Sequence, residues 1–183
     1  MGLHLPYVSG ESPGVFSHLS DPDIRLVVWE RPNPCRHEGY PPFAQPTKDE
    51  LPCLPDWLAG DINLLGGLYT AITDQEWRVR LECAEARTCP AFHEDAVRLR
   101  LLVTYRGPGT EWIMNPDDPH VREIPAGAVA AFKGRAWTSS QRLLHRSAKA
   151  SVRRPRWVLA MDAMPRANPA SAASSAAPDL HHA

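Results

Sequence analysis

The segment Cys-Pro-Ala-Phe-His-Glu-Asp, residues 89–95, contains side chains that bind metals. His93 and Asp95 form a His-x-Asp pair, and His145 is the natural third ligand. Two imidazoles and one carboxylate hold non-haem Fe(II) on one face and leave open positions for substrate and oxygen. The thiol of Cys89 is either a small packing residue beside this site or a fourth ligand. Four ligands would favour closed, tetrahedral Zn(II), so the sequence leaves both metals open.

Arg156 lies eleven residues after His145, at the start of an apolar segment. A guanidinium there could bind a carboxylate through two parallel hydrogen bonds. Burying an arginine without an anionic partner costs several kcal/mol, so we expect a carboxylate of a ligand or of the protein to meet it. Arg153 and Arg154 are close in sequence and compete for the same role.

The metal-ligand pair is followed by a run, residues 97–105, that alternates apolar and other residues. Its odd positions are Val, Leu, Leu, Val and Tyr, whereas positions 98 and 100 are arginines. A period of two predicts a strand with one buried face and one solvent-exposed face. His93 and Asp95 are also odd, so we expect their side chains to point with the buried residues into the interior.

Three further residues are candidates for the wall of a binding pocket: Thr104, Tyr105 and Trp112. β-branched and aromatic residues in strands are also common core residues, so a purely structural role is the alternative.

The remaining elements must position these side chains. Apolar residues spaced by three and four over residues 56–73 predict one helix, although three glycines weaken it and require support from tertiary packing. Short β-branched and aromatic runs predict strands at residues 24–30, 77–83, 97–105, 110–113, 128–132, 142–145 and 156–161. This pattern predicts a mainly β, α+β fold: a jelly-roll or double-stranded β-helix barrel of the cupin type, with the helix as a buttress.

The chain length of 183 residues fits one domain, which we place at residues 23–164. Residues 1–22 lack periodicity and are expected to be loose, and residues 165–183, rich in Ala, Ser and Pro, are expected to form a disordered tail. Residues 35–55 are proline-rich and predict an irregular connection.

The composition limits the possible partners. Lys and Arg number 20 against 21 Asp and Glu, a net charge of -1, which gives no general attraction to nucleic acid or to an anionic membrane. The four cysteines form no CxxC pair, and neither a secretory signal nor an apolar run long enough to span a bilayer occurs, so we expect a cytoplasmic protein. A small molecule or a peptide is the expected substrate, and the oligomeric state stays open.

The order of these motifs resembles that of the Fe(II)- and 2-oxoglutarate-dependent dioxygenases, and among them the phytanoyl-CoA hydroxylase branch. The matching features are His93-Glu94-Asp95, the distal His145 followed by Ser147, and Arg156 after a basic cluster. The resemblance implies that the two histidines and the aspartate hold Fe(II), and that Arg156 binds the distal carboxylate of 2-oxoglutarate. The substrate is not implied.

A second resemblance covers most of the chain. The segment 89–95, the run 100–112, Phe132-Lys133-Gly134-Arg135 and His145-Arg146-Ser147 resemble the bacterial domain of unknown function 1826. That family implies a link to zinc homeostasis without naming a reaction. The alternative to an oxygenase is therefore a non-enzymatic zinc-binding protein that uses Cys89 with the other three ligands, and a metal-free β-barrel ranks last.

Overall fold

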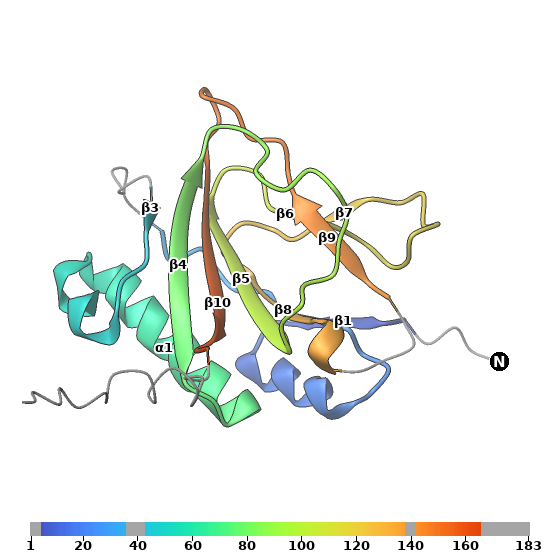
Figure 1. The fold of residues 1–183 in the computed structure, drawn as a ribbon, viewed down its shortest axis with the longest axis horizontal. Helices are drawn as coiled ribbons and strands as arrows, with labels where there is room; N and C mark the ends of the chain where they lie inside the picture. Colours follow the sequence, from blue (N-terminus) through green and yellow to red (C-terminus); the bar gives the residue numbers. More distant parts are fainter. Residues whose placement is uncertain (1–4, 36–42, 138–141, 166–183) are drawn as a thin grey trace, which may run out of the picture.

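The computed structural model describes residues 5–35, 43–137 and 142–165, which form a seven-stranded sheet, a three-stranded sheet and a layer of helices (Figure 1). The strands are β1 (Tyr7–Gly10), β2 (Leu26–Trp29), β3 (Phe43–Ala44), β4 (Trp77–Ala84), β5 (Leu99–Arg106), β6 (Thr110–Ile113), β7 (Arg122–Glu123), β8 (Val129–Lys133), β9 (Leu144–Ser147) and β10 (Arg156–Ala163). The helices are α1 (Asp56–Thr73) and the 3-10 segments η1 (Pro13–Ser20), η2 (Lys48–Cys53) and η3 (Arg135–Trp137).

The larger sheet has the order β1-β2-β8-β5-β10-β4-β3. β1 and β2 are parallel, and the other neighbouring pairs are antiparallel. β5 and β10 lie at its centre, and in their register Val158 faces Thr104 and Ala160 faces Leu102. Directly opposed residues of an antiparallel pair point to the same face of the sheet, so the even positions of β5 and β10 share one face.

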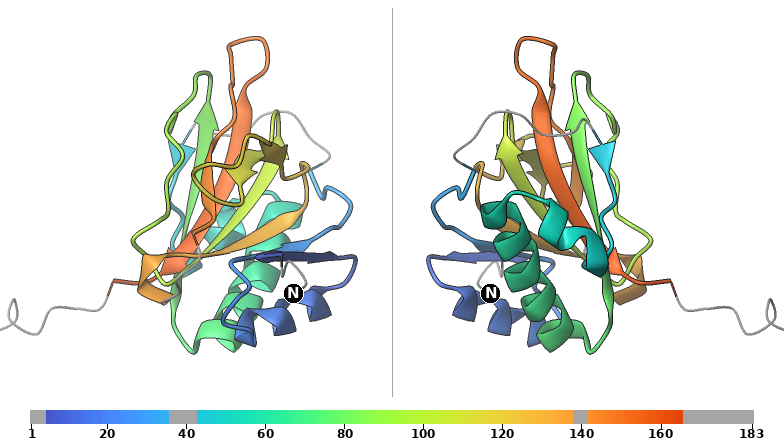
Figure 2. Two further views of the ribbon diagram at one scale, coloured as in Figure 1. Left: turned by 90° about the vertical axis from the view of Figure 1, so that its right-hand side faces the viewer. Right: turned by 90° about the vertical axis from the view of Figure 1, so that its left-hand side faces the viewer.

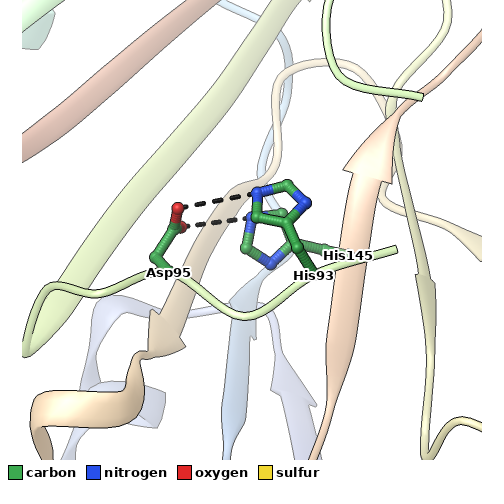
Figure 3. A group of neighbouring side chains, drawn as sticks. All are labelled: His93, Asp95 and His145. Carbon is green, nitrogen blue, oxygen red and sulfur yellow. Dashed lines mark ion pairs between the residues drawn. The ribbon is translucent and has the colours of Figure 1, made fainter. Parts of the chain in front are cut away.

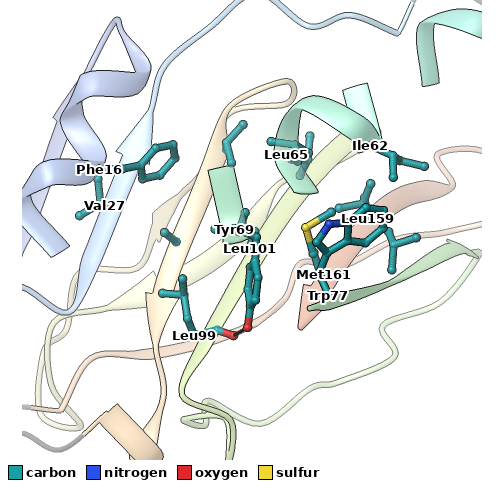
Figure 4. Packing of buried hydrophobic residues seen from close by; sticks show 14 of the residues in the cluster. Phe16, Val27, Ile62, Leu65, Tyr69, Trp77, Leu99, Leu101, Leu159 and Met161 are labelled. Carbon is teal, nitrogen blue, oxygen red and sulfur yellow. Dashed lines mark hydrogen bonds between the residues drawn. The ribbon is translucent and has the colours of Figure 1, made fainter. Parts of the chain in front are cut away.

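The odd positions of β5 face the helices. Leu99, Leu101 and Val103 are fully buried, and they pack in one cluster with Leu159 of β10 and Tyr69 of α1 (Figure 4). Figure 2 shows α1 on one side of the larger sheet, as a buttress. The expected helix and its position against a sheet are therefore both present.

Close packing explains one of the glycines of α1. A Cβ atom on Gly66 would lie 2.3 Å from the ring of Trp77 on β4, whereas one on Gly67 would meet nothing within 4 Å. Gly66 therefore allows the helix to lie directly on an aromatic side chain, at the cost of the lower helix propensity of glycine.

The even positions of β5 face the smaller sheet, which has the order β7-β6-β9. A second apolar cluster joins Trp112 of β6 to Leu26 and Val28 of β2 and to Ala130 and Phe132 of β8. The face of β5 that carries Arg98 and Arg100 was expected to be solvent-exposed. Around Arg100, however, this face is partly covered, because it lies between the two sheets. The alternation in the sequence correctly separates the two faces of β5. It does not show that helices cover one face and the smaller sheet covers the other.

The mainly β fold with a helical buttress is confirmed. Within the described residues, no ladder joins the smaller sheet to the larger one, so two facing sheets stand where a barrel was expected. Short strands such as β1, β3 and β7 had not been predicted, because two to four residues are too few for a periodic signal.

The expectation of a loose N-terminal segment is wrong for residues 5–22. β1 pairs with β2, and Val15, Phe16 and Leu19 of η1 are buried in the helix-side core. These three apolar side chains stand among Ser, Pro and Gly, and their burial depends on a sheet formed by distant residues. The predicted tail lies outside the described residues from 166 onward. None of the described helices is both long and apolar enough to cross a membrane.

Candidate metal centre

His93 lies opposite His145 of β9, although it is not itself part of a strand. The backbone N–H of His93 donates to the carbonyl oxygen of His145 at 3.0 Å, and that of His145 donates to His93 at 2.9 Å, which makes an isolated antiparallel bridge. Directly opposed residues of such a pair point to the same side. Their imidazole rings accordingly lie together, with centroids 4.6 Å apart. The bridge adds residue 93 to the edge of the smaller sheet.

Asp95 completes a cluster of three potential ligands (Figure 3). One potential ligand atom from each of His93, Asp95 and His145 lies within 4.8 Å of the others. The Oδ1 atom of Asp95 is 3.6 Å from Nε2 of His93, and its Oδ2 atom is 3.2 Å from Nε2 of His145. The sequence spacing thus brings the three predicted ligands to one place.

The chemistry of this cluster suits a divalent cation. The Oδ2 atom of Asp95 is buried and lies 3.2 Å from Nε2 of His145, without a hydrogen bond of good geometry, so it remains available to a cation. The Nδ1 atom of His93 lies 3.0 Å from the carbonyl oxygen of Ala91, so Nδ1–H can donate there and leave Nε2 free to bind a metal. His145 is 5% exposed and packs against the ring of Phe132, with centroids 4.4 Å apart.

The protonation states also suit metal binding. Burial by itself would raise the pKa of Asp95, but His145, Arg100 and His93 together hold the pKa of that carboxyl below its ordinary value. Burial lowers the pKa of His145 despite the opposing effect of Asp95. A carboxylate and a neutral imidazole are the forms that bind metals.

The strand start explains how Asp95 reaches the histidines. β5 begins at Leu99, so residues 93–97 precede the strand and do not follow its alternation. The expectation that Asp95 would point with the odd, buried positions is wrong: its carboxylate contacts the guanidinium of Arg100, at an even position.

Charged contacts hold the ligand segment on both sides. Glu94, between the two ligands, forms a buried ion pair with Arg25, the residue that precedes β2. Arg25 also donates to the carbonyl oxygen of Lys133 at 2.9 Å. On the other side, Arg100 donates to Asp95 at 2.6 Å and forms a bidentate pair with Asp162 on β10. Neither contact was predicted, although an aspartate within the apolar strand β10 is itself a sign of a buried charged partner.

Arg156 is buried in the same cavity as the histidines. The cavity has a volume of about 140 Å³, and Arg156 and Arg100 line it together with both histidines and Cys89. Arg156 is 4% exposed and donates to the carbonyl oxygen of Pro108 at 3.1 Å and to the hydroxyl of Thr110 at 2.7 Å. Burial lowers the pKa of Arg156 despite the opposing effect of Glu82 and Glu123, yet an arginine stays charged at neutral pH.

Among the described residues no carboxylate forms an ion pair with the guanidinium of Arg156, although Glu82, which lines the same cavity, and Glu123 act on it from a greater distance. Arg153 and Arg154 are exposed on the turn before β10, so of the three arginines only Arg156 is directed into the cavity.

Of the three pocket candidates, one lies beside Arg156. The hydroxyl of Thr104 accepts a hydrogen bond from Arg156 at 3.4 Å. Tyr105 lies on the opposite face of the sheet, where its hydroxyl donates to Asp61 of α1 at 2.6 Å. Trp112 packs between the sheets, against Tyr7, with ring centroids 4.8 Å apart. A pocket role is therefore wrong for Tyr105, and Trp112 is part of the second apolar cluster.

Cys89 lies beside the cluster and is not one of its three members. Its Sγ atom is 3.6 Å from Nδ1 and 3.8 Å from Nε2 of His93. One carboxylate oxygen of Asp95 and one nitrogen from each of the two imidazoles meet without it.

Comparisons with known proteins give one family and several distant structures. Residues 41–162, more than half of the 183 residues, match the family described as "Protein of unknown function (DUF1826)". No curated protein sequence matches the chain.

The solved structures that are similar to this chain include three oxygenases. The Arabidopsis thaliana dioxygenase for auxin oxidation 1, in complex with 2-oxoglutarate, is 14% identical, with coverage of 60% of this chain and 52% of its own and a TM-score of 0.45. A Pseudomonas putida prolyl-4-hydroxylase is 13% identical. The match covers 68% of this chain and 72% of that protein, with a TM-score of 0.47. A 2OG-Fe(II) oxygenase family protein from Caulobacter crescentus is 18% identical. The match covers 58% of this chain and 44% of that protein, with a TM-score of 0.40. The chain thus spans about half the length of the first and the third.

Proposed function

We propose that this chain, which belongs to the DUF1826 family, is an oxygenase that depends on Fe(II) and 2-oxoglutarate and acts on a small molecule or a peptide. One observation carries the proposal: His93 and His145, which cluster with the carboxylate of Asp95, line a small cavity together with Arg156, a buried arginine that forms no ion pair with a described side chain. A divalent metal and a ligand carboxylate would satisfy both groups at once.

His93, Asp95 and His145 are the proposed ligands of Fe(II). Three protein ligands on one face leave positions for a co-substrate and for oxygen. When bound, the iron supplies the activation of oxygen, coupled to the decarboxylation of 2-oxoglutarate to succinate. The Oδ2 atom of Asp95, which has no hydrogen bond of good geometry, and the Nε2 atom of His93, whose Nδ1–H can donate to Ala91, support this assignment.

Arg156 is the proposed partner of the distal carboxylate of 2-oxoglutarate. Its Nε and one terminal nitrogen are oriented by Pro108 and Thr110, which keeps the guanidinium in place. A cavity of about 140 Å³ is smaller than the roughly 300–1,000 Å³ of pockets for drug-sized ligands, and so suits a short dicarboxylate. Because both Arg156 and His145 are almost completely buried, their interactions with an anion or a metal would be stronger than in water.

The proposed architecture is a double-stranded β-helix in which the larger and smaller sheets are the two facing halves. His93 and His145 come from the smaller sheet and its edge, Asp95 from the segment before β5, and Arg156 from the larger sheet. This division supports the proposal because a co-substrate between metal and arginine would lie between the two sheets.

Zinc binding without catalysis is the second candidate. The closeness of Cys89 to His93 favours it, since a thiolate would complete a tetrahedral site. Under this alternative, Cys89→Ser lowers zinc affinity by orders of magnitude, whereas under the oxygenase proposal the same change has little effect on Fe(II) affinity.

The proposed activity is tested by measuring succinate formed from 2-oxoglutarate in the presence of Fe(II), ascorbate and air, without an added substrate. We expect slow formation by the wild-type protein, and none above background with His145→Ala or Arg156→Ala. Equal rates for the wild-type protein and both variants would contradict the proposal.

A further inference from the structure

Arg100 lies between two carboxylates beside the proposed metal site. Its Nε donates to Oδ1 of Asp162 at 2.7 Å and its Nη2 donates to Oδ2 at 2.8 Å, so both oxygens of Asp162 are engaged. The remaining terminal nitrogen, Nη1, donates to Oδ1 of Asp95 at 2.6 Å. The side chain of Arg100 is 18% exposed, and those of Asp95 and Asp162 are 10% and 8% exposed.

The sheet fixes this arrangement. In the antiparallel register of β5 and β10, Leu101 faces Met161 and Leu102 faces Ala160. Continuing it by one residue places Arg100 opposite Asp162, and their side chains on the same face. A bidentate pair holds the plane of the guanidinium, so the direction of Nη1 is fixed by two central strands of the larger sheet.

Because of this contact, the two oxygens of Asp95 differ. Oδ1 accepts a charge-assisted hydrogen bond from Arg100, whereas Oδ2 is buried and lies 3.2 Å from Nε2 of His145, without a hydrogen bond of good geometry. A carboxylate binds a metal through one oxygen or through both. Binding through both would use one more position on the metal.

We propose that Arg100, held by Asp162, is a positioning residue that keeps Oδ1 of Asp95 engaged, so that a metal is bound through Oδ2 alone. The inference rests on the proposed metal site and adds a function for two residues outside the ligand set. Through this contact one coordination position stays open to a co-substrate. Hydrogen-bond partners of metal ligands typically change metal affinity by 10–100-fold.

The experiment uses the full chain and Co(II) as the probe. Its affinity is measured by competition with a chelating dye, and its visible absorption reports the coordination number. We expect Arg100→Gln to weaken Co(II) binding about 10–100-fold and to change the visible bands toward a higher coordination number. Arg100→Lys keeps the charge but cannot make three directed hydrogen bonds, so it should restore affinity only in part.

Asp162 provides a second test of the same proposal. Because Asp162 acts through Arg100, Asp162→Asn should weaken binding, and the double variant should bind no more weakly than Arg100→Gln alone. Arg98→Gln is the matched control: this arginine is two residues away and exposed, its guanidinium stacks 4.7 Å from the Trp137 ring, and its loss should change neither affinity nor spectrum.

The possible outcomes separate the two proposals. If the wild-type protein binds Co(II) and Arg100→Gln binds it with the same affinity and spectrum, the positioning role is overturned while the metal site stands. If the wild-type protein binds no Co(II), the proposed function itself fails. Should Arg100→Gln not fold, as judged by circular dichroism, Asp162→Asn and Arg100→Lys decide, and unchanged affinity and spectrum in both would overturn the proposal.

Discussion

At the scale of single residues, two buried charged groups are only partly satisfied within the protein. The Oδ2 atom of Asp95 lies 3.2 Å from Nε2 of His145 without a hydrogen bond of good geometry, and Arg156 has only neutral oxygens as hydrogen-bond acceptors. Buried polar and charged groups are normally satisfied, because leaving them without partners costs free energy. Arg156 lines the same cavity as the two histidines that cluster with Asp95, and we assign a cation to Asp95 and an anion to Arg156.

The first prediction concerns Arg156. Replacing it with lysine keeps a positive charge but removes the planar fork, and Arg156→Ala removes both. Because a hydrogen bond to a charged group contributes roughly 1.5–3 kcal/mol, we expect Arg156→Ala to weaken 2-oxoglutarate binding by about 10–100-fold, with lysine intermediate. Isothermal titration calorimetry of the metal-loaded protein measures this. Arg154→Ala, at an exposed position, is the control and should bind normally.

Glu94, between the two ligands, leads to the second prediction. Its carboxylate pairs with Arg25, and these side chains are 9% and 2% exposed. Removing one member of a buried pair costs roughly 3–5 kcal/mol, because the other charge stays buried. We expect Glu94→Gln to lower the free energy of unfolding by about that amount in urea denaturation.

The exposed pair Lys48–Glu76 serves as the comparison, since its side chains are 54% and 67% exposed. Exposed ion pairs contribute about 0–1 kcal/mol, so Glu76→Gln should change little. Equal effects of Glu94→Gln and Glu76→Gln would contradict the structural role assigned to Glu94.

At the scale of elements, helix α1 packs against strand β4, and substitutions at two neighbouring glycines of α1 can test this contact. Gly66→Ala would push a methyl group into the ring of Trp77, whereas Gly67→Ala meets open space. Overpacking typically costs about 1–3 kcal/mol, and alanine is favoured over glycine in a helix by up to about 1 kcal/mol. We expect Gly66→Ala to lower the thermal unfolding midpoint and Gly67→Ala to raise it. If both substitutions raised the thermal unfolding midpoint, or both lowered it, the packing of α1 on Trp77 would be contradicted.

Elements with a strong period were the most predictable. The helix was expected at residues 56–73, which are its observed bounds, and the strands expected at 110–113 and 77–83 match β6 and β4 to within one residue. The short strands β1 and β3 and the burial of η1 depend on contacts between distant parts of the chain. Local composition does not contain that information, and for the N-terminal segment it suggested the opposite.

The predicted ligands converge even though one argument for them was wrong. Strand alternation was extended back to residues 93 and 95, but these precede β5, and His93 belongs instead to the edge of the smaller sheet. The prediction of the metal site depended on the residue types and their order along the chain. The argument from odd and even strand positions did not contribute to it. Arg100 and Asp162 were missed because a sequence period shows which residues share a face without showing what covers it.

At the scale of the whole molecule, the proposed site joins the two sheets. His93 and His145 belong to the smaller sheet and its edge, while Arg100 and Arg156 belong to the larger one. A ligand that binds only the folded protein stabilises it by about 2.7 kcal/mol at one hundred times its dissociation constant. We therefore expect Co(II) to raise the thermal unfolding midpoint of the wild-type protein, and excess chelator to reverse the rise. His145→Ala should show no rise, and His18→Ala, at an exposed position, should behave as the wild-type protein does.

The most direct test of the central claim is an anaerobic titration of the metal-free protein with Fe(II) and then with 2-oxoglutarate, followed by visible absorption. If His93, Asp95 and His145 hold iron and Arg156 holds the distal carboxylate, a charge-transfer band of a chelated 2-oxo acid appears at one equivalent. The band should be lost in Asp95→Ala and should need much more 2-oxoglutarate in Arg156→Ala. Absence of any band, together with tight Zn(II) binding that requires Cys89, would contradict the account and identify a zinc-binding protein instead.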